Sequence, residues 1–547
     1  MPDLILGPVL RYVSDTDATV WVETDTPCEV EVLGHTARTF AVHGHHYALV
    51  VVRGLEPASE HEYAVELDGQ TRWPEPDSRF PPSVIRTLDE RGPVEIVFGS
   101  CRVALPNDPP YTLSKDEDER GREHDALRVL ALEMLEGERE APHLIAMLGD
   151  QVYVDEGAPE TREFIRSRRD TSMAPGEEVA DFEEYTHLYW ESWGEPVIRW
   201  LLSTVSTAMV IDDHDMHDDW KISRSWLEEM RRQPWWKERA LSGLVSYWVY
   251  QHIGNLSPDR LGEEEEFKAA VEADDAAPVL REFVEWVDDD GEGKVWSFKR
   301  DIGSTRLIIV DDRTGRVLRE DRRSIFDDHE WDWIQGEARG DFDHVLIGTS
   351  DPWLLTPALH YLEAWNEAVC DGVWGGRAAR IGERIRRAVD FDHWSAFRMS
   401  FDRLKKLVEE LGAGRRGAPP ASISVLSGDV HHAYLAEAGF PRQAAVRTPV
   451  YQAVCSPFRN ALDAHERETI RLSLSRPAHA IARMLARSAG VDDPGMGWRF
   501  VNGPYFDNQV ATIVIDGRSA TMRLEKTAPN SERDGARLET VFERRLA

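Results

Sequence analysis

The sequence predicts an α/β protein that begins with a small all-β sandwich, and three observations lead to this fold class. Residues 1–90 alternate apolar and polar side chains in short runs that turn-forming residues separate. In residues 91–547, apolar runs of four to seven residues alternate with long helical stretches. These apolar runs end in polar clusters, which is typical of strands whose carboxyl ends form a ligand site. We therefore expect a β-sandwich domain in 1–90 and an α/β domain in 91–547.

The N-terminal sandwich is predicted from runs such as ATVWVET and CEVEVLG and from the Asp68-Gly69 turn. The segment VVVRGLEPASEHEYAVELDG is similar to the late strands of fibronectin type III-like domains. Domains of this type are mostly scaffolds, so we expect this one to contribute no chemistry of its own.

The net charge of the chain makes some classes of binding partner unfavourable. The chain of 547 residues has a formal net charge of -35, which opposes broad attraction to nucleic acid or to anionic lipid. The same charge suits a protein adapted to high salt. The N-terminus lacks the features of a signal peptide, and no stretch approaches ~20 uninterrupted apolar residues. We expect a cytoplasmic protein without a membrane span, unless the sequence is the trimmed form of a secreted protein.

The second domain contains six predicted strands that deliver polar residues at their carboxyl ends. Two or more cations in such a site need a carboxylate that bridges them, and Asp150 in LGDQVY is the natural candidate. The polar clusters thus predict a two-metal hydrolase. The six segments are VEIVFGSCR, LIAMLGDQVYVD, AMVIDDHD, RLIIVDDR, HVLIGTSDP and ISVLSGDVHH.

The stretch IDDHDMHDDW, residues 211–220, contains five aspartates and two histidines next to an apolar run. Charge runs are usually solvated surface. Here imidazoles stand beside the carboxylates and a tryptophan closes the run, so we interpret it as part of a cation site that relieves the repulsion between like charges.

Four motifs, GSCR, GDQVY, DDHD with a following DDW, and SGDVHH, together resemble the PhoD-like alkaline phosphatases, a branch of the calcineurin-like metallophosphoesterases. The resemblance covers residues 94 to about 525. It implies a metallophosphoesterase-type layered β-sheet domain flanked by helices, preceded by the sandwich. It also implies hydrolysis of small-molecule phosphate esters, mono- or diesters, by a metal-activated hydroxide.

The resemblance also implies a set of metal ligands. Asp212 is the alternative to Asp213, because strand geometry would point only one of the two inward. One thiolate and one phenolate favour iron(III), and the surplus carboxylates suit calcium, so Fe3+ and Ca2+ are the expected cofactors, with other divalent metals as the alternative. The expected ligands are Cys101, Asp150, Tyr153, Asp213, Asp429 and His431.

Further roles follow for residues next to these ligands. We expect His214 to be the catalytic group, giving a hydrogen bond or proton to the phosphate or leaving-group oxygen, with Asp215 orienting it. Arg102 and Arg313 are predicted to bind the substrate phosphate, although either has nearby aspartates with which to pair. Asp218-Asp219 suits a helix N-cap better than an additional calcium site.

The long insertions, roughly 157–204, 221–300 and 353–420, are predicted to be largely helical, with their tryptophans in the core. Two alternative functions remain. One is a non-catalytic calcium-binding or adhesion protein on an inactive hydrolase scaffold. The other is a zinc hydrolase of the metallo-β-lactamase type, although the spacing H-x-x-H-D-D of this chain differs from the H-x-H-x-D-H of that site.

Overall fold

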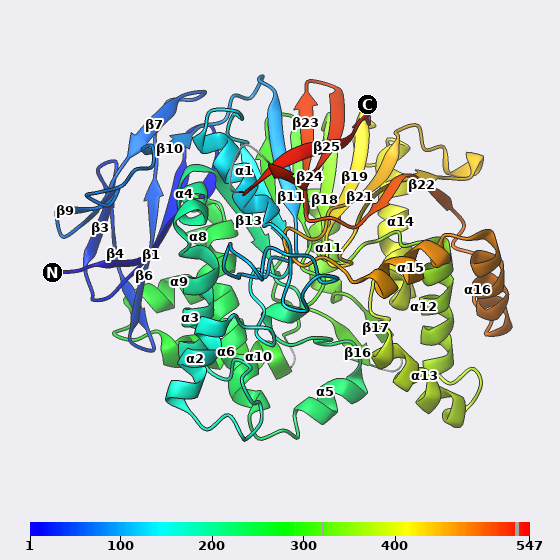
Figure 1. Cartoon of the computed structure of the whole chain (residues 1–547). Coiled ribbons are helices and arrows are strands. Elements are labelled where there is room, and N and C mark those ends of the chain that lie inside the picture. The colour runs from blue at the N-terminus through cyan, green and yellow to red at the C-terminus, as the bar shows by residue number, and fades with distance from the viewer. Residues whose placement is uncertain (290, 320–321, 531–534) are drawn as a thin grey trace.

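The computed structural model describes residues 1–289, 291–319, 322–530 and 535–547 (Figure 1). It has the predicted mixed α/β architecture, in which all-β sheets come first and larger sheets flanked by helices follow. The N-terminal strands lie at one end of the molecule, and the helices of the last insertion lie at the opposite end.

The N-terminal residues form two four-stranded antiparallel sheets and a two-stranded ribbon. The strands are β1 (Leu4–Val13), β2 (Ala18–Thr24), β3 (Glu29–Val32), β4 (His35–Arg38), β5 (Phe40–Val42), β6 (His45–Val52), β7 (Glu60–Tyr63), β8 (Val65–Leu67), β9 (Gln70–Trp73) and β10 (Ser83–Arg86). The sheet orders are β1-β2-β6-β5 and β4-β3-β8-β9, and β10 pairs with β7. Val20 and Val22 of β2 share one hydrophobic cluster with Val30 of β3, so the two sheets enclose a core.

The first of these sheets is buried on both faces. Trp21 alternates with Val20 and Val22 along β2, so it points away from the sandwich core. Its ring lies 6.0 Å from that of Trp193 and 5.2 Å from that of Tyr250, both in the helical insertions. The sandwich is therefore also a wall of the main core. Its fibronectin type III-like character and the domain division at residue 90 stay predictions.

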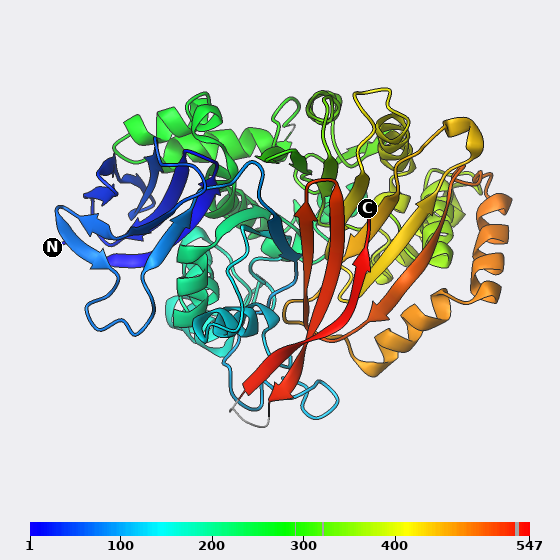
Figure 2. The ribbon, with the colours of Figure 1, turned by 90° about the horizontal axis from the view of Figure 1, so that it is seen from above.

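Two large sheets form the centre of the molecule (Figure 2). The six-stranded sheet contains β11 (Val94–Gly99), β12 (Leu144–Leu148), β13 (Ser206–Val210), β23 (Gln509–Asp516), β24 (Ser519–Asn530) and β25 (Gly535–Arg545). The seven-stranded sheet contains β14 (Phe298–Ile302), β15 (Thr305–Ile309), β18 (His344–Gly348), β19 (Ser422–Ser427), β20 (Ala433–Gly439), β21 (Val450–Val454) and β22 (Gly497–Tyr505). Their orders are β13-β12-β11-β23-β24-β25 and β14-β15-β18-β19-β21-β20-β22. The short strands β16 (Val317–Arg319) and β17 (Arg322–Ser324) pair separately.

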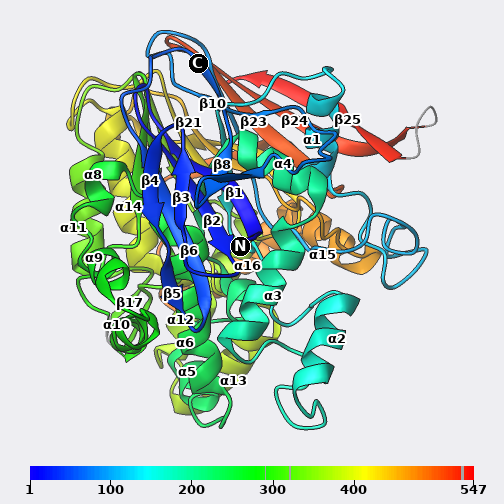
Figure 3. The same cartoon turned by 90° about the vertical axis from the view of Figure 1, so that its left-hand side faces the viewer.

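The strands β11, β12 and β13 are parallel, as are β15, β18, β19 and β21. All six predicted strands are therefore present, and the fold divides them equally between the two sheets. The alternation of side chains places Phe98 and Leu346 in a cluster shared by both sheets, whereas Val97 and Val345 belong to separate clusters with the helices. The sheets thus pack face to face, and helices cover their outer faces (Figure 3).

The three predicted helical insertions are helical. They contain α2 (Pro159–Arg168), α3 (Phe182–Trp193), α4 (Pro196–Thr204), α5 (Arg224–Met230), α6 (Trp236–Ser246), the π-helical turn η2 (Tyr247–His252), α7 (Ile253–Asn255), α8 (Pro258–Leu261), α9 (Glu265–Glu272), α10 (Ala277–Asp289), α12 (Pro357–Cys370), α13 (Gly376–Ala388), the 3-10 turn η3 (Trp394–Ala396) and α14 (Arg398–Gly412). Most of their tryptophans, among them Trp193, Trp226 and Trp248, are buried, as expected for core packing.

The remaining helical elements lie outside these insertions. They are α1 (Ala126–Leu135), the 3-10 turn η1 (Asp213–Asp215), α11 (Asp328–Glu337), the 3-10 turn η4 (Arg442–Ala444), α15 (Ala464–Ser473) and α16 (Arg476–Ser488). The described residues form no helix that is long and apolar enough to cross a membrane.

Candidate metal centre

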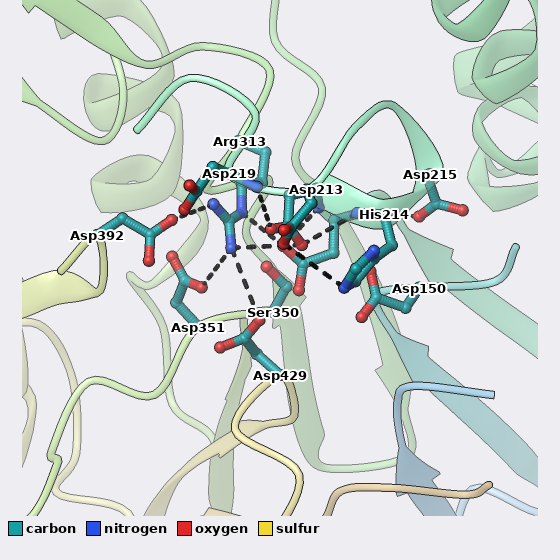
Figure 4. Close-up of polar contacts among 12 residues, drawn as sticks. Asp150, Asp213, His214, Asp215, Asp219, Arg313, Ser350, Asp351, Asp392 and Asp429 are labelled. Carbon is teal, nitrogen blue, oxygen red and sulfur yellow. Dashed lines mark hydrogen bonds and ion pairs between the residues drawn. The ribbon is translucent and has the colours of Figure 1, made fainter. Parts of the chain in front are cut away.

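The loops that follow the parallel strands of the two sheets meet at one place. Cys101 follows β11, Asp150 follows β12, and Asp429 follows β19. The amide of Asp429 donates to Ser100 Oγ at 2.9 Å, which ties a loop of one sheet to a loop of the other. Residues far apart in the sequence therefore converge between the sheet ends (Figure 4).

Three groups of side chains at this place have ligand atoms within 4.8 Å of one another, and each group suits a metal ion. Asp150 belongs to all three groups, which is the position expected of a bridging carboxylate. The groups are Cys101 with Asp150 and His431, Asp150 with Asp213 and His214, and Asp150 with Asp212, Asp213 and Asp429.

Four of the predicted ligands have left-handed backbone conformations. The φ angles are 56° for Cys101, 49° for Asp150, 63° for Asp429 and 49° for His431. Such conformations are uncommon for residues other than glycine and cluster at functional sites, where the surroundings hold them in place. The turns after β11, β12 and β19 therefore adopt backbone conformations that are energetically unfavourable, and these conformations bring the four side chains together.

Cys101 and Tyr153 both contact the shared carboxylate. The Sγ atom of Cys101 lies 3.2 Å from Asp150 Oδ2, and the Tyr153 hydroxyl lies 3.3 Å from the same oxygen. Burial, together with the nearby charge of Asp150, raises the pKa of both groups. A bound cation would reverse this effect and favour thiolate and phenolate.

The carboxylates of the centre are not fully satisfied by protein groups. Asp150 Oδ1 and Asp212 Oδ2 are buried, and neither has a hydrogen-bond partner among the described residues. Burial raises the pKa of both carboxyls well above the ordinary value, and neighbouring aspartates add to the shift. Unpaired buried carboxylate oxygens are costly unless a cation binds them, so this donor set fits a metal site.

His431 has the protonation state that a metal ligand needs. Burial lowers its pKa to about 3, so the imidazole is neutral and has a free lone pair. The neighbouring His432 turns away from the centre, since its Nδ1 lies 2.6 Å from the carbonyl of Val430 and its ring stacks on Tyr434.

His214 lies beside the shared carboxylate and is held by a second aspartate. Its Nδ1 is 3.0 Å from Asp155 Oδ1, and its ring stacks on Tyr153 with centroids 4.4 Å apart. Burial opposes the imidazolium, but Asp155, together with the charges of Asp213 and Asp150, raises the pKa of His214 well above its ordinary value. The raised pKa favours the protonated imidazole, whose Nε2 lies 3.8 Å from Asp218 Oδ1.

The expectation that Asp215 orients His214 is wrong. The carboxylate of Asp215 accepts hydrogen bonds from the amides of Gln151, Val152 and Asp212 at 3.2, 3.2 and 2.9 Å. It thereby connects the turn after β12 to the turn after β13, and in Figure 4 it points away from the centre. Asp155 performs the orienting role instead.

Arg313 is a buried cation among the aspartates. Its Nε donates to Asp212 Oδ1 at 2.5 Å, its Nη2 to Asp351 Oδ1 at 3.0 Å, and its Nη1 to Asp392. Its Nη2 also lies 3.7 Å from Asp429 Oδ1 and 3.8 Å from Asp213 Oδ1, and its side chain is 1% exposed (Figure 4). These contacts favour a role in holding the carboxylates, and binding of substrate by Arg313 stays a prediction.

Arg102 is bound in a similar way. Its Nε donates to Asp125 Oδ2 at 2.7 Å, and its Nη1 donates to the carbonyl of Ser192 at 2.8 Å. Both partners are buried. The guanidinium thus links the loop after β11 to α1 and α3, and its predicted contact with phosphate is untested.

The acidic stretch after β13 differs from the expectation in two ways. Asp212 and Asp213 both reach the centre, because they lie beyond the end of β13 at the turn η1, where strand alternation no longer applies. The cap of α5 is Ser223, so the helix-cap interpretation of Asp218-Asp219 is wrong. The amide of Asp219 instead donates to Asp213 Oδ2 at 3.0 Å.

Two residues of the third insertion that the sequence analysis missed also reach the centre. His393 contacts Asp429 Oδ2 through Nε2 at 3.1 Å and Glu363 Oε1 through Nδ1 at 2.7 Å. Asp392 pairs with Arg313 and with Arg316. The available signal was an Asp-His pair between aromatic residues in FDHW, residues 391–394, inside a segment otherwise predicted to be helical.

The metallo-β-lactamase alternative requires His217 at the metal, and the structure places it elsewhere. Its Nδ1 lies 2.7 Å from the carbonyl of Asp218, and its ring packs against Trp226, Trp235 and Trp236. His217 belongs to none of the candidate metal groups found among the described residues.

Comparison with known proteins supports the fold and leaves the activity open. Residues 1–85 match a family model described as a domain of unknown function (DUF7800). No curated protein matches the chain. A solved structure of PhoD is similar over 98% of this chain and 89% of that chain, with a TM-score of 0.59 and 12% sequence identity. The chain therefore has the fold of PhoD, which confirms the expected resemblance for the architecture.

A second solved structure, a maltogenic amylase from S. marinus, aligns over 95% of this chain and 76% of that chain at 9% identity. Its TM-score of 0.19 is too low to indicate a common fold.

The contacts of Arg313 predict that its loss mainly affects stability. In Arg313→Met, three buried carboxylates lose their cation, so the free energy of unfolding should fall by about 3–5 kcal/mol. Chemical denaturation measures this change, and Arg377→Met, at an exposed position, should change the free energy by less than about 0.5 kcal/mol. If Arg313→Met keeps its stability and only raises KM for a phosphate ester, Arg313 is a substrate ligand instead.

Proposed function

We propose that the protein is a metal-dependent hydrolase of phosphate esters, acting on small-molecule mono- or diesters. The observation that carries the proposal is the position of Asp150, which belongs to all three candidate metal groups and keeps one buried oxygen without a hydrogen-bond partner among the described residues. A carboxylate shared between adjacent cation sites is the arrangement of two-metal hydrolases. The PhoD-like fold supports the same reaction class.

The donor atoms divide into two kinds, and this division supports iron(III) and calcium as the metals. Cys101 and His431 supply sulfur and imidazole nitrogen to one candidate group with Asp150, and the Tyr153 hydroxyl contacts the same carboxylate. Another group joins Asp150 to Asp212, Asp213 and Asp429, which supply carboxylate oxygens alone. Thiolate and phenolate suit iron(III), and a purely oxygen set suits calcium.

When bound, the metal ions would supply a nucleophile at neutral pH and neutralise charge on the phosphoryl group. The protein's own acid is His214. Asp155 holds its Nδ1 and raises its pKa against the effect of burial, so Nε2 retains a proton to give to the leaving oxygen. Its side chain is 19% exposed, which lets a substrate reach it.

A second protonated imidazole lies at the candidate metal centre. Burial opposes its charge, but Glu363 and Asp429 raise the pKa of His393 well above the ordinary value, so it is cationic. Its side chain is 13% exposed, whereas that of Arg313 is 1% exposed. Both imidazoles are paired with carboxylates, so bound cations would supply the net positive charge that an anionic substrate needs in a protein of net charge -35.

Replacing the shared carboxylate tests the proposal directly. Asp150→Asn should abolish hydrolysis of an aryl phosphate and of an aryl phosphodiester and should lower the metal content, because the bridging charge serves more than one cation. Metal analysis and steady-state kinetics on the purified variant measure both effects. Full activity with the metal content of the wild type would refute the assignment. An inactive wild-type protein that contains its metals would support a non-catalytic calcium-binding role.

His214→Ala should separate proton transfer from metal binding. Loss of a general acid costs about 10²–10⁴ in kcat, while the metal content should stay near that of the wild type. The loss should be smaller for substrates whose leaving group needs no proton, such as a nitrophenolate. A variant that is purified without metal would instead identify His214 as a ligand.

Iron(III) at this centre would be detectable by absorption spectroscopy. Thiolate and phenolate bound to iron(III) give a charge-transfer band, so the purified protein should be coloured. Tyr153→Phe and Cys101→Ser should each shift or remove the band, whereas Cys455→Ser, at a buried cysteine outside the centre, should leave it unchanged. A colourless, fully active protein that contains only zinc or manganese would exclude iron(III).

A further inference from the structure

Two surface segments of the protein have a composition opposite to that of the rest of the chain. Residues 373–389 contain five arginines and one glutamate, and residues 471–488 contain four arginines and no acidic residue. The whole chain has 99 acidic and 64 basic residues, so this concentration of arginine is a local exception. We call the surface formed by these two segments the basic edge.

The basic edge also exposes large apolar side chains. Seven of the fourteen exposed large hydrophobic residues that the described part of the chain contains belong to it. Scattered exposed hydrophobics are normal, but a gathering of half of them on two short segments indicates an interaction surface. The seven residues are Val373, Trp374, Ile381, Val389, Leu472, Ile481 and Met484.

The helix α16 buries small side chains and exposes large apolar ones, and packing within the protein does not explain this distribution. It presents the small residues Ala482 and Ala486 to the cluster formed with α12, and it exposes Ile481 and Met484, which are 61% and 67% exposed. A helix that served only to cover α12 would bury its larger apolar side chains. The outward position of Ile481 and Met484 therefore favours a partner outside the protein.

The two segments form one continuous surface. The indole Nε1 of Trp374, just before α13, donates to the carbonyl of Ser488 at the end of α16 at 3.3 Å. The ring of Trp374 lies 5.8 Å from that of Trp365 on α12, the helix that packs against both α13 and α16. The edge lies at the end of the molecule opposite the N-terminal sheets (Figures 1 and 2).

Several arginines of the basic edge have charges that the protein does not neutralise. Arg377, Arg384 and Arg476 are exposed, and none of them forms an ion pair with an acidic side chain in the described ranges. Among the described residues, Arg380 bonds only to the carbonyl of Gly376. In a chain with a large excess of carboxylates, unpaired arginines beside exposed apolar side chains suit an anionic partner.

We propose that the basic edge docks the protein on an anionic lipid surface. Arginines attract the headgroups, while exposed isoleucine, methionine and tryptophan side chains insert at the boundary with the acyl chains, as in helices that lie in the membrane interface. The acidic remainder of the molecule does not prevent this, because charges beyond about 8 Å are largely screened at physiological ionic strength.

Other partners fit this surface less well. A nucleic acid backbone pairs with the arginines but offers little to Ile481 and Met484. A second copy that docked through the same surface would bring arginines against arginines. An anionic membrane satisfies both the charge and the apolar side chains.

Vesicle co-sedimentation tests the proposal. The wild-type protein should bind vesicles of phosphatidylcholine mixed with phosphatidylglycerol, should not bind vesicles of phosphatidylcholine alone, and should dissociate at high salt. Each arginine near such a surface contributes about fivefold to binding, so Arg377→Glu with Arg384→Glu should weaken it by about 25-fold or more. Ile481→Ser with Met484→Ser should weaken it by about tenfold.

A matched control and a separate activity assay make the result decisive. Arg38→Glu, in β4, with Arg79→Glu, in the loop between β9 and β10, changes the net charge equally in the N-terminal region and should bind like the wild type. Hydrolysis of a soluble aryl phosphate should be unchanged in all these variants, so a failure of the docking proposal is independent of the proposed activity.

Three outcomes would overturn the proposal. They are equal binding of the wild type to phosphatidylcholine vesicles, an equal loss in the control variant, and tighter binding to a DNA fragment that the same arginine substitutions abolish.

Discussion

Repulsion between closely spaced carboxylates governs the arrangement of side chains at the candidate metal centre. Asp150, Asp212 and Asp213 are buried, Asp429 is partly buried, and the four come within a few ångströms of one another at the ends of strands from both sheets. The protein offsets part of this repulsion with the cations Arg313, His214 and His393. The rest remains, as the raised pKa values of Asp150 and Asp212 indicate, and it makes the site selective for cations.

The fold explains how the protein tolerates several carboxylates of like charge in one place. Each carboxylate is anchored by a strand in a hydrophobic core, and the burial of those strands supplies the stability that the site lacks. Turns with positive φ angles then direct the side chains of Cys101, Asp150 and His431 inward. Asp155 and Glu363 hold the two imidazoles of the centre in place, because each contacts the Nδ1 atom of one of them, His214 and His393 respectively.

The sequence allowed the prediction of those parts of the site that lie directly after buried strands. The apolar runs located the six strands, and the residues that follow them converge as expected. His393 and Asp392 were missed because they follow a helix in an insertion, where no strand pattern marks them. The role of Arg313 depends on which carboxylates surround it in space, and Asp212 could not be separated from Asp213 because the chain leaves the strand before reaching them.

The position of β11 in its sheet affects how the protein folds while it is being synthesised. This strand lies in the middle of its sheet, between β12, which follows within about fifty residues, and β23 near the C-terminus. The side of β11 that pairs with residues 511–515 stays without its partner until about 400 further residues have been synthesised. Unpaired strand edges promote aggregation, and pairing over such a separation is slow. Until residues 511–515 have been synthesised, helper proteins or transient contacts are the ways in which this edge can be protected.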